Sequence, residues 1–255
     1  GIENLRLVMA GDIRHSRVAR SCISLLGKLG LTGIRLLNRL GIRIIIVKHP
    51  LSGRTYISKG LLKRARQLAR KNVEVLGPLV TSERPLVGIE PSAILGFRDE
   101  FPELVGKELS KLARELGDNA LTLEEYLDRA REQGEFDSSL FTKEKASIKV
   151  HGHCQQKAIA SSKETIAMLS IPKNYTVTEI PSGCCGMAGS FGYEAEHYEA
   201  SMQMGNLTLF PAIKAAGEAD LVVADGTSCR SQISHGTGRQ AVHVVQVLRQ
   251  ALPVN

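Results

Sequence analysis

The sequence contains no tryptophan, and aromatic residues make up only 4% of its 255 residues. Proteins that bind single-stranded nucleic acid stack bases on aromatic side chains, so we expect no nucleic-acid partner. The net charge of +7 does not change this expectation, because the basic residues are spread over the polar faces of helical patterns. They indicate a solvated surface, or a basic face that docks onto an acidic partner or an anionic membrane surface.

Long apolar runs are also absent. The longest, such as residues 42–47, are far too short to span a bilayer. The first residues, Gly1-Ile2-Glu3-Asn4, contain neither the basic nor the apolar segment of a secretion signal. We therefore expect a cytoplasmic location, with the inner face of the membrane as a second place where the chain can act. The length and the apolar content of 43% suit one large domain or two small lobes.

The second half of the chain, by contrast, is rich in cysteine. Four of the five cysteines lie in three short segments: His151-Gly152-His153-Cys154, Gly183-Cys184-Cys185-Gly186 and Thr227-Ser228-Cys229. Four thiolates are the ligand set of many iron–sulfur clusters and closed zinc sites. Outside an oxidising compartment, clustered cysteines are more often metal ligands or redox groups than disulfides. Cys22 lies far away in a helical pattern and is expected to be an ordinary buried thiol.

Strand and helix patterns alternate along the chain, which predicts an α/β fold. The expected strands span residues 5–10, 42–47, 85–89, 147–151, 175–180 and 221–224. The expected helices span residues 16–29, 32–40, 60–75, 156–169, 193–216 (one or two helices) and 238–252, and residues 102–134 are mostly helical. Repeated strand–helix–strand units imply parallel sheets.

The two halves follow the same order of strands, loops and helices. This order predicts two pseudo-repeated lobes, each a small parallel-sheet β/α unit with flanking helices. Overlaying them places Leu51-Ser52 where Cys184-Cys185 lie, and Ala93 where Cys229 lies. Residues 1–105 are the expected lobe without cluster cysteines, 106–145 a helical connector, and 146–255 the lobe with the cysteines. In the first lobe, Arg54 and Glu90 lie at the matching loop ends. They are expected to form an ion pair, and the alternative is contact with the cluster lobe or a substrate.

All three cysteine segments follow expected strands, so they should converge where the carboxyl ends of parallel strands meet. His151, His153 and Arg230 flank the cysteines and are expected to orient and tune them. One interpretation is an iron–sulfur cluster, and its four ligands would be Cys154, Cys184, Cys185 and Cys229. The others are a zinc site or a structural or redox-active thiol pair, and unrelated buried thiols. Adjacent cysteines favour the cluster, because they can bind different irons.

Several longer stretches carry a further signal. They are Ser52-Gly53-Arg54-Thr55, Ile57-Ser58-Lys59-Gly60-Leu61-Leu62, Gly88-Ile89-Glu90-Pro91-Ser92, Phe97-Arg98-Asp99-Glu100, His151-Gly152-His153-Cys154-Gln155-Gln156-Lys157-Ala158, GCCGMAGSFGY at 183–193, and Gly226-Thr227-Ser228-Cys229-Arg230. With them, residues from about 33 to 255 resemble the cysteine-rich (CCG) domain of iron–sulfur oxidoreductases. That domain occurs in heterodisulfide reductase, in the iron–sulfur subunit of glycolate oxidase, and at the C-terminus of FAD-linked D-lactate dehydrogenase-like oxidases.

The resemblance implies that the four cysteines ligate a [4Fe–4S]-type cluster that passes electrons from a flavin to a quinone or another carrier. The chain has neither a flavin domain nor a ferredoxin-type cysteine run. It would therefore be a fragment or subunit of a flavin-linked 2-hydroxyacid oxidoreductase, such as D-lactate or glycolate dehydrogenase. FAD would lie on a missing domain or partner subunit, and the chain would be inactive alone. The alternative is a zinc- or thiol-stabilised docking scaffold without a redox role.

The chain departs from the family pattern in its cysteine spacing, in its last cysteine and in its first lobe: 29 residues separate Cys154 from Cys184, and 43 separate Cys185 from Cys229. Gln232 stands where the common pattern has a last cysteine, three residues after Cys229. The first lobe lacks its cysteines altogether, so a second cluster is not expected there.

A second resemblance lies at the start of the chain. Residues 4–21 (NLRLVMAGDIRHSRVARS) resemble a strand–turn–helix segment of the aspartate-binding domain of aspartate carbamoyltransferase. There, the arginine at the place of Arg17 helps to hold the aspartate carboxylate. The carbamoyl-phosphate domain has no counterpart here, so we do not expect carbamoyl transfer. The basic residues could hold an anion at a helix N-terminus, but a helix start capped by Ser16 explains the segment without a ligand.

Overall fold

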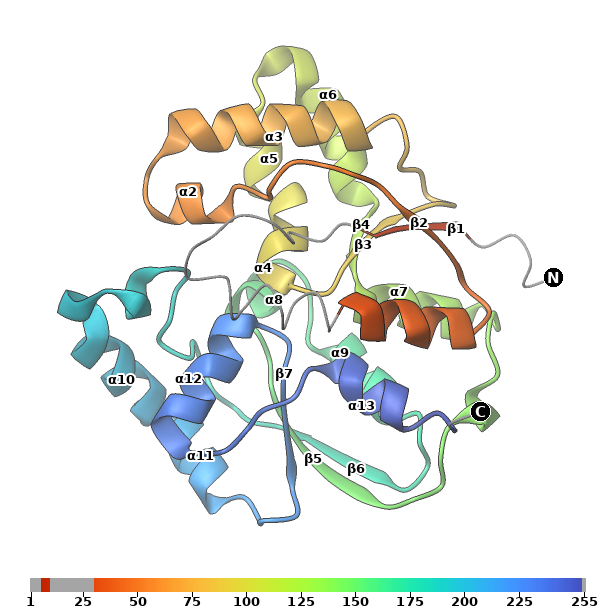
Figure 1. The fold of residues 1–255 in the computed structure, drawn as a ribbon, viewed down its shortest axis with the longest axis vertical. Helices are drawn as coiled ribbons and strands as arrows, with labels where there is room; N and C mark the ends of the chain where they lie inside the picture. The colour runs from red at the N-terminus through yellow and green to blue at the C-terminus, as the bar shows by residue number, and fades with distance from the viewer. Residues whose placement is uncertain (1–5, 10–29, 254–255) are drawn as a thin grey trace. The chain divides into compact units, whose positions relative to one another are not determined.

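The computed structural model describes residues 6–9 and 30–253, with side chains from residue 30 onward. The chain divides into two compact units, one extending to Asp137 and the other beginning at Ser138 (Figure 1). Each unit combines one small parallel sheet with several helices, so the expected α/β fold is confirmed. Of residues 4–21, only β1 (Arg6–Met9) lies within the described residues, and Cys22 lies outside them.

The first unit contains a four-stranded sheet with the strand order β2-β1-β3-β4, in which all neighbours are parallel. The other strands are β2 (Arg43–Ile46), β3 (Leu86–Gly88) and β4 (Ala120–Thr122). The β-branched isoleucines of β2 suit an extended backbone. Every residue of β3 and β4 is buried, as is typical of a strand inside a parallel sheet.

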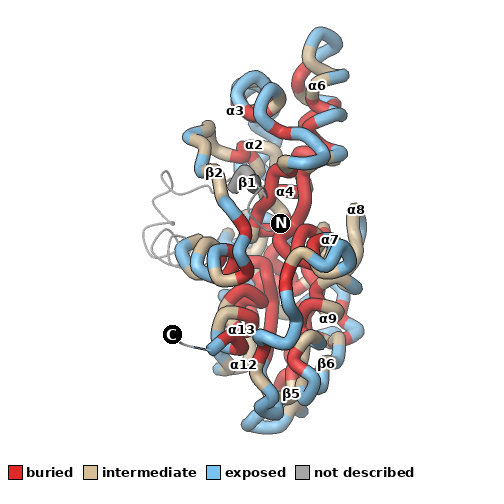
Figure 2. The backbone as a smooth tube through the Cα atoms, turned by 90° about the vertical axis from the view of Figure 1, so that its right-hand side faces the viewer, coloured by how far each residue is buried: buried red, intermediate tan, exposed pale blue. Residues whose placement is uncertain are grey.

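The helices of the first unit are a helix through residues 30–39, α2 (Arg54–Ser58), α3 (Leu62–Leu76), α4 (Pro91–Ile94), α5 (Glu100–Leu104), α6 (Lys107–Asp118) and α7 (Leu123–Glu132). α3 illustrates why they fold: apolar residues at helical spacing, among them Leu68, Val73 and Leu76, are buried on one side. Its other side carries exposed basic residues. Figure 2 shows buried and exposed residues alternating along α3.

The second unit contains a three-stranded parallel sheet with the order β6-β5-β7. Its strands are β5 (Ala146–His151), β6 (Tyr175–Glu179) and β7 (Leu221–Ala224). Val242 extends the sheet by a parallel bridge to Val223. Its helices are α8 (Cys154–Ile159), α9 (Lys163–Leu169), α10 (Tyr198–Leu207), α11 (Leu209–Ala215), α12 (Thr227–Thr237) and α13 (Val244–Gln250).

The expected strands all occur. The short helices α2 and α4 were not predicted. The expected helix at residues 16–29 lies outside the described residues, and two other expected helices were wrong in extent. Residues 156–169 form two helices, because Ala160 leaves the helical conformation and the Ser161 hydroxyl accepts a hydrogen bond from the Lys163 N–H (2.9 Å). The last helix begins at Val244 rather than near Gly238, since Val242 is paired with the sheet and His243 caps the helix. β4 and α12 were not predicted.

The predicted division into lobes and a connector stays a prediction. The segment 106–145 includes β4, which pairs with β3 of the first sheet. Within the described part of the chain, no helix is both long enough and apolar enough to cross a membrane.

Candidate metal centre

The three cysteine segments begin at the same edge of the second sheet. β5 ends at His151 and leads into α8, whose first residue is Cys154. β6 leads into the loop that carries Cys184 and Cys185, and β7 leads into α12, which contains Cys229. β6 and β7 are the two parallel neighbours of β5, so the carboxyl ends of all three strands meet at one edge.

At this edge the four thiols form a chain of hydrogen bonds, and none is in a disulfide. Cys154 interacts with Cys184, Cys184 with Cys185, and Cys185 with Cys229. Cys185 and Cys229 are buried, whereas Cys154 and Cys184 are half-buried. The site therefore has a buried inner half and a partly open outer half.

The thiols do not share their protons equally. The hydrogen bonds that Cys184 accepts from Cys154 and Cys185 lower the pKa of Cys184, and the same bonds raise the pKa of the two donors. Cys185 has a single thiol proton, which lies between Cys184 and Cys229 and lowers the pKa of Cys229 as well; a hydrogen bond with His151 and the neighbouring His153 lower that pKa further. Cys184 and Cys229 are thus the sulfurs that most readily become thiolates, the form that binds metal.

Backbone N–H groups also point at the sulfurs. The Gly186 N–H donates to Cys184 Sγ at 3.3 Å, and the N–H groups of Gly186 and Ala188 both lower the pKa of Cys184. This arrangement needs an unusual backbone: Gly186 has φ +99° and Ala188 has φ +39°. A left-handed conformation costs a non-glycine residue free energy, so Ala188 carries local strain at the site. Such N–H groups stabilise negative charge on sulfur.

His151 is part of the inner half. One of its ring nitrogens and the sulfurs of Cys185 and Cys229 lie within 4.8 Å of one another. The imidazole is 1% exposed, and its Nδ1 lies 2.7 Å from the Ser182 hydroxyl. The sequence predicted that His151 lies beside the cysteines and orients them. Only the structure shows that one of its ring nitrogens lies close to two of the sulfurs.

His153 and Arg230 shape the loops that carry the cysteines. His153 caps α8, because its Nδ1 accepts a hydrogen bond from the Gln155 N–H at 3.2 Å. The buried Arg230 guanidinium donates to the carbonyls of Ala224 (2.8 Å) and Asp225 (2.6 Å). It therefore fixes the turn between β7 and α12, the helix that carries Cys229. No ion pair between Arg230 and a carboxylate occurs among the described residues.

The residues fit a metal centre. Four sulfurs and one imidazole converge from three strand ends, and two of the sulfurs already favour the thiolate. Sulfur and imidazole donors suit iron–sulfur clusters and zinc, and they are poor ligands for magnesium or calcium.

Gln232, which stands in place of the family's last cysteine, faces another element. Its Nε2 donates to the carbonyl (3.2 Å) and the hydroxyl (2.9 Å) of Ser201 on α10. It thus holds α12 against α10, and the same Ser201 carbonyl lies against Gly186.

The first unit has a different group at its strand ends. Arg54 forms the expected ion pair with Glu90 (3.5 Å) and a hydrogen bond with Ser92. The Ser92 hydroxyl in turn donates to Glu90 at 2.8 Å. The positions that the overlay matched to Cys185 and Cys229 are Ser52 and Ala93, so this edge offers no sulfur donors.

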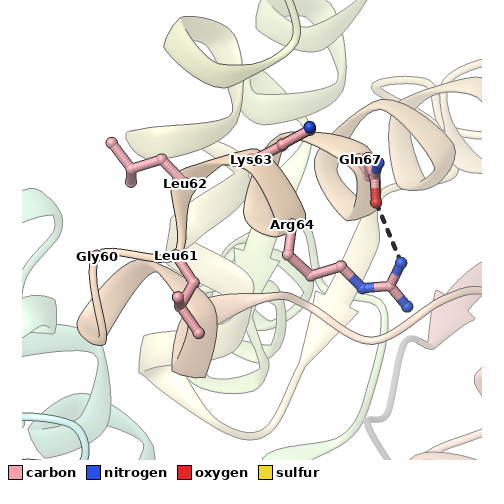
Figure 3. Close-up of a pocket in the computed structure, with 6 residues that line it drawn as sticks. All are labelled: Gly60, Leu61, Leu62, Lys63, Arg64 and Gln67. Atoms are coloured by element: carbon pink, nitrogen blue, oxygen red, sulfur yellow. Dashed lines mark hydrogen bonds between the residues drawn. The ribbon is translucent and has the colours of Figure 1, made fainter.

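A hollow at the start of α3 is unrelated to the thiols (Figure 3). Its lining comes from a single stretch of chain: Gly60, Leu61, Leu62, Lys63, Arg64 and Gln67. Arg64 is bonded to Gln67 at 3.1 Å, and all six residues are at the surface. A hollow lined by one turn of helix has no converging groups with which to hold a substrate.

Comparison with known proteins points to dehydrogenases. The chain is 28% identical over 220 residues to D-2-hydroxyglutarate dehydrogenase of Escherichia coli K12, a match that covers 86% of this chain and 20% of the relative. The corresponding enzyme of Haemophilus influenzae is 27% identical over 227 residues, covering 86% of this chain and 21% of the relative. One subunit of the anaerobic glycerol-3-phosphate dehydrogenase of E. coli K12 is 28% identical over 244 residues, covering 94% of this chain and 57% of the relative.

The chain therefore spans about a fifth of the length of the first relatives, and little more than half of the glycerol-3-phosphate dehydrogenase relative. No family model matches it. The relatives support an oxidoreductase-related role, and they are consistent with the resemblance to the CCG domain of FAD-linked oxidases.

Proposed function

We propose that this chain is the electron-transfer module of a flavin-linked 2-hydroxyacid oxidoreductase, and that Cys154, Cys184, Cys185 and Cys229 hold an iron–sulfur cluster of the [4Fe–4S] type. The observation that carries the proposal is the meeting of four thiols from three strand ends in one hydrogen-bonded group. An iron–sulfur cluster takes up and releases single electrons.

The chain's own residues would set the properties of such a cluster. Backbone N–H groups at Cys184 offset negative charge on the sulfur and favour the reduced state. The buried Arg230 adds a positive charge next to Cys229 in the sequence. The burial of Cys185 and Cys229 keeps water from one half of the site, whereas the half-buried Cys154 and Cys184 give an acceptor or donor a short path to the other half.

The partner in this proposal is a flavoprotein domain or subunit that carries FAD. The relatives are named as dehydrogenases of D-2-hydroxyglutarate and of glycerol-3-phosphate, and one of them is named as a subunit. The two compounds in these names are a hydroxy acid and a phosphate ester that carries hydroxyl groups. Oxidation of such a hydroxyl group releases two electrons, which a flavin can pass on one at a time to single-electron carriers. A quinone or another carrier is the proposed final acceptor.

Peripheral association with the inner face of a membrane is a further part of the proposal. It is supported by α3, where exposed Lys63, Arg64 and Arg66 follow the exposed Leu61 and Leu62. Basic side chains beside exposed apolar ones suit the boundary between anionic headgroups and acyl chains.

The pseudo-repeat of the two lobes is likewise a proposal, and the topology supports it. The strand order β2-β1-β3 of the first sheet has the same form as β6-β5-β7 of the second. Each sheet also has one further parallel partner: β4 beside β3 in the first unit, and Val242 beside Val223 of β7 in the second. In both units a helix follows directly, and a capping box closes its first turn. The matched N-caps are Thr122 and His243.

Anaerobic purification followed by iron, acid-labile sulfide and EPR measurements tests the function. We expect about four iron and four sulfide per chain in the wild type, and loss of most of both in Cys185→Ser. Cys22→Ser is the matched control, because it removes a thiol outside the three segments and should leave the cluster intact. About one zinc without sulfide would replace the proposal by the docking scaffold, and protein without metal would leave a thiol role only.

A further inference from the structure

We propose that His151 is itself a metal ligand, beside Cys185 and Cys229 in the inner half of the proposed centre. This inference rests on the proposed metal centre and changes its donor set from four sulfurs to four sulfurs and one nitrogen. The sequence suggested only that His151 orients the cysteines.

The first support is position. His151 is the last residue of the central strand β5, and the segments with Cys185 and Cys229 follow the two strands that flank it. Its ring nitrogen lies within 4.8 Å of both sulfurs. A nitrogen and two sulfurs this close together can be donors to one metal centre.

The second support is the contact on the other side of the ring. His151 Nδ1 lies 2.7 Å from the Ser182 hydroxyl, a buried pair in which either group can be the donor. Histidines that bind metals commonly have their other ring nitrogen hydrogen-bonded to a nearby oxygen, which fixes the ring for ligation.

The third support is the environment of the other nitrogen. His151 Nε2 is buried and has no nitrogen or oxygen partner among the described residues, and the imidazole interacts with the Cys229 thiol. Its polar neighbours on this side are therefore sulfurs of the proposed centre, and a metal bound there would have the imidazole as a further donor. Among the described residues of the second unit, no other buried nitrogen of this kind lies with two cysteine sulfurs.

His153 provides the contrast. Its Nδ1 accepts the hydrogen bond from the Gln155 N–H, so the lone pair of this imidazole is already used in capping α8. Both histidines lie near Cys154 in the sequence, but only a ring nitrogen of His151 lies with the two inner sulfurs. His153 therefore serves as an internal control for the effect of any neighbouring imidazole.

A nitrogen ligand has a consequence for the centre. Imidazole is neutral where thiolate is negative, so its use raises the reduction potential relative to a site with thiolates alone. Replacing His151 by cysteine should therefore move the potential to more negative values. A histidine that only packed against the cysteines would give no such shift.

The experiment is pulsed EPR on reduced, anaerobically purified protein labelled with ¹⁵N at histidine. We expect a strongly coupled ¹⁵N resonance in the wild type and in His153→Asn, which keeps a capping side chain, and its loss in His151→Gln. A wild-type cluster without that resonance, or a resonance that persists in His151→Gln, would overturn the inference while the cluster itself stands.

The metal content separates this inference from the proposed function. If the protein contains zinc and no sulfide, the proposed function fails, and X-ray absorption at the zinc edge then tests His151. One nitrogen ligand in the wild type, absent from His151→Gln, would uphold the inference, and sulfur ligands alone would refute it. Protein that binds no metal would refute both.

Discussion

At the scale of single residues, Arg230 carries a positive charge into the interior of the second unit. Its guanidinium donates to two backbone carbonyls at the end of β7. Replacing it by glutamine should lower the free energy of unfolding by about 2–4 kcal/mol, because two charge-assisted hydrogen bonds are lost. It should also make the cluster potential more negative, since a nearby positive charge favours the reduced form. Urea unfolding and a redox titration measure the two effects.

Arg239→Gln is the matched control for Arg230. Arg239 also donates to backbone carbonyls, those of Gly217 (3.2 Å) and Asp220 (2.6 Å), but it lies beyond the C-terminus of α12, away from the three cysteine segments. Arg239→Gln should therefore lower the free energy of unfolding and leave the reduction potential of the proposed cluster unchanged. Equal shifts of the potential in both variants would show that Arg230 acts only through the fold.

The thiols of the metal-free chain should differ in reactivity. Cys154 and Cys184 are both half-buried, but the hydrogen bonds among the thiols raise the pKa of the first and lower the pKa of the second. A lowered pKa keeps Cys184 a thiolate as the pH falls, so its alkylation rate should change little between about pH 6 and pH 8. An unfolded thiol, with a pKa of about 8.5, should slow almost tenfold per pH unit over most of this range.

Mass spectrometry after brief treatment with iodoacetamide at about pH 6 gives the order of labelling. We expect Cys184 to react before Cys154, the other half-buried thiol. The urea-unfolded chain is the reference, in which all cysteines should react alike. Preferential labelling of Cys154 would contradict the direction of the hydrogen bond between them.

At the scale of elements, the loop after β6 depends on Gly186. Its φ of +99° is unfavourable for other residues, and an added Cβ would strike the Ser201 carbonyl. Gly186→Ala should destabilise the fold by about 2–4 kcal/mol and lower the metal content, because the N–H that faces Cys184 would move.

Gly183→Ala supplies the control in the same loop. Gly183 has no positive φ, and nothing lies within 4 Å of an added Cβ. Thermal unfolding and metal analysis of the two variants should therefore give a large loss for Gly186→Ala and almost none for Gly183→Ala. Similar losses of stability and metal in both variants would mean that the loop excludes added side chains for a reason other than the φ angle of Gly186.

The elements also show how far the sequence leads. The strands were predictable because short β-branched or apolar runs are typical of buried strands, as in Ile44-Ile45-Ile46 of β2. β4 was not predicted because a strand of three residues is too short to show an alternating pattern. α12 was not predicted because its residues Thr227–Thr237 contain few apolar side chains. The late start of α13 depends on Val242 pairing with Val223, a contact between distant residues that local patterns do not reveal.

The meeting of the cysteine segments was predictable for a similar reason. The cysteines could be placed together because each follows a strand, and strand ends of a parallel sheet meet. The ion pair of Arg54 with Glu90 followed from matching loop ends in the same way. The different proton affinities of the thiols, and the place of His151 among them, depend on side-chain directions within a few ångströms. No spacing in the sequence encodes these directions.

At the scale of the whole molecule, positive charge is concentrated in the first third of the chain. Lys63, Arg64, Arg66 and Lys71 are exposed along α3, whereas the cysteine segments contain few basic residues. Charge gathered on one exposed helix attracts an anionic surface more strongly than the same charge spread evenly, and salt weakens that attraction.

This distribution predicts that the chain binds vesicles containing anionic phospholipid and does not bind neutral vesicles. Each basic residue near such a surface contributes about 1 kcal/mol, so Lys63→Glu combined with Arg66→Glu should weaken binding by roughly 30-fold or more. Lys173→Glu, an exposed charge reversal in the second unit, is the control and should have little effect. Sedimentation with vesicles at low and high salt measures the binding. If both variants bind equally, α3 is not the contact with the membrane, and its basic face would then suit an acidic surface on the proposed flavoprotein partner.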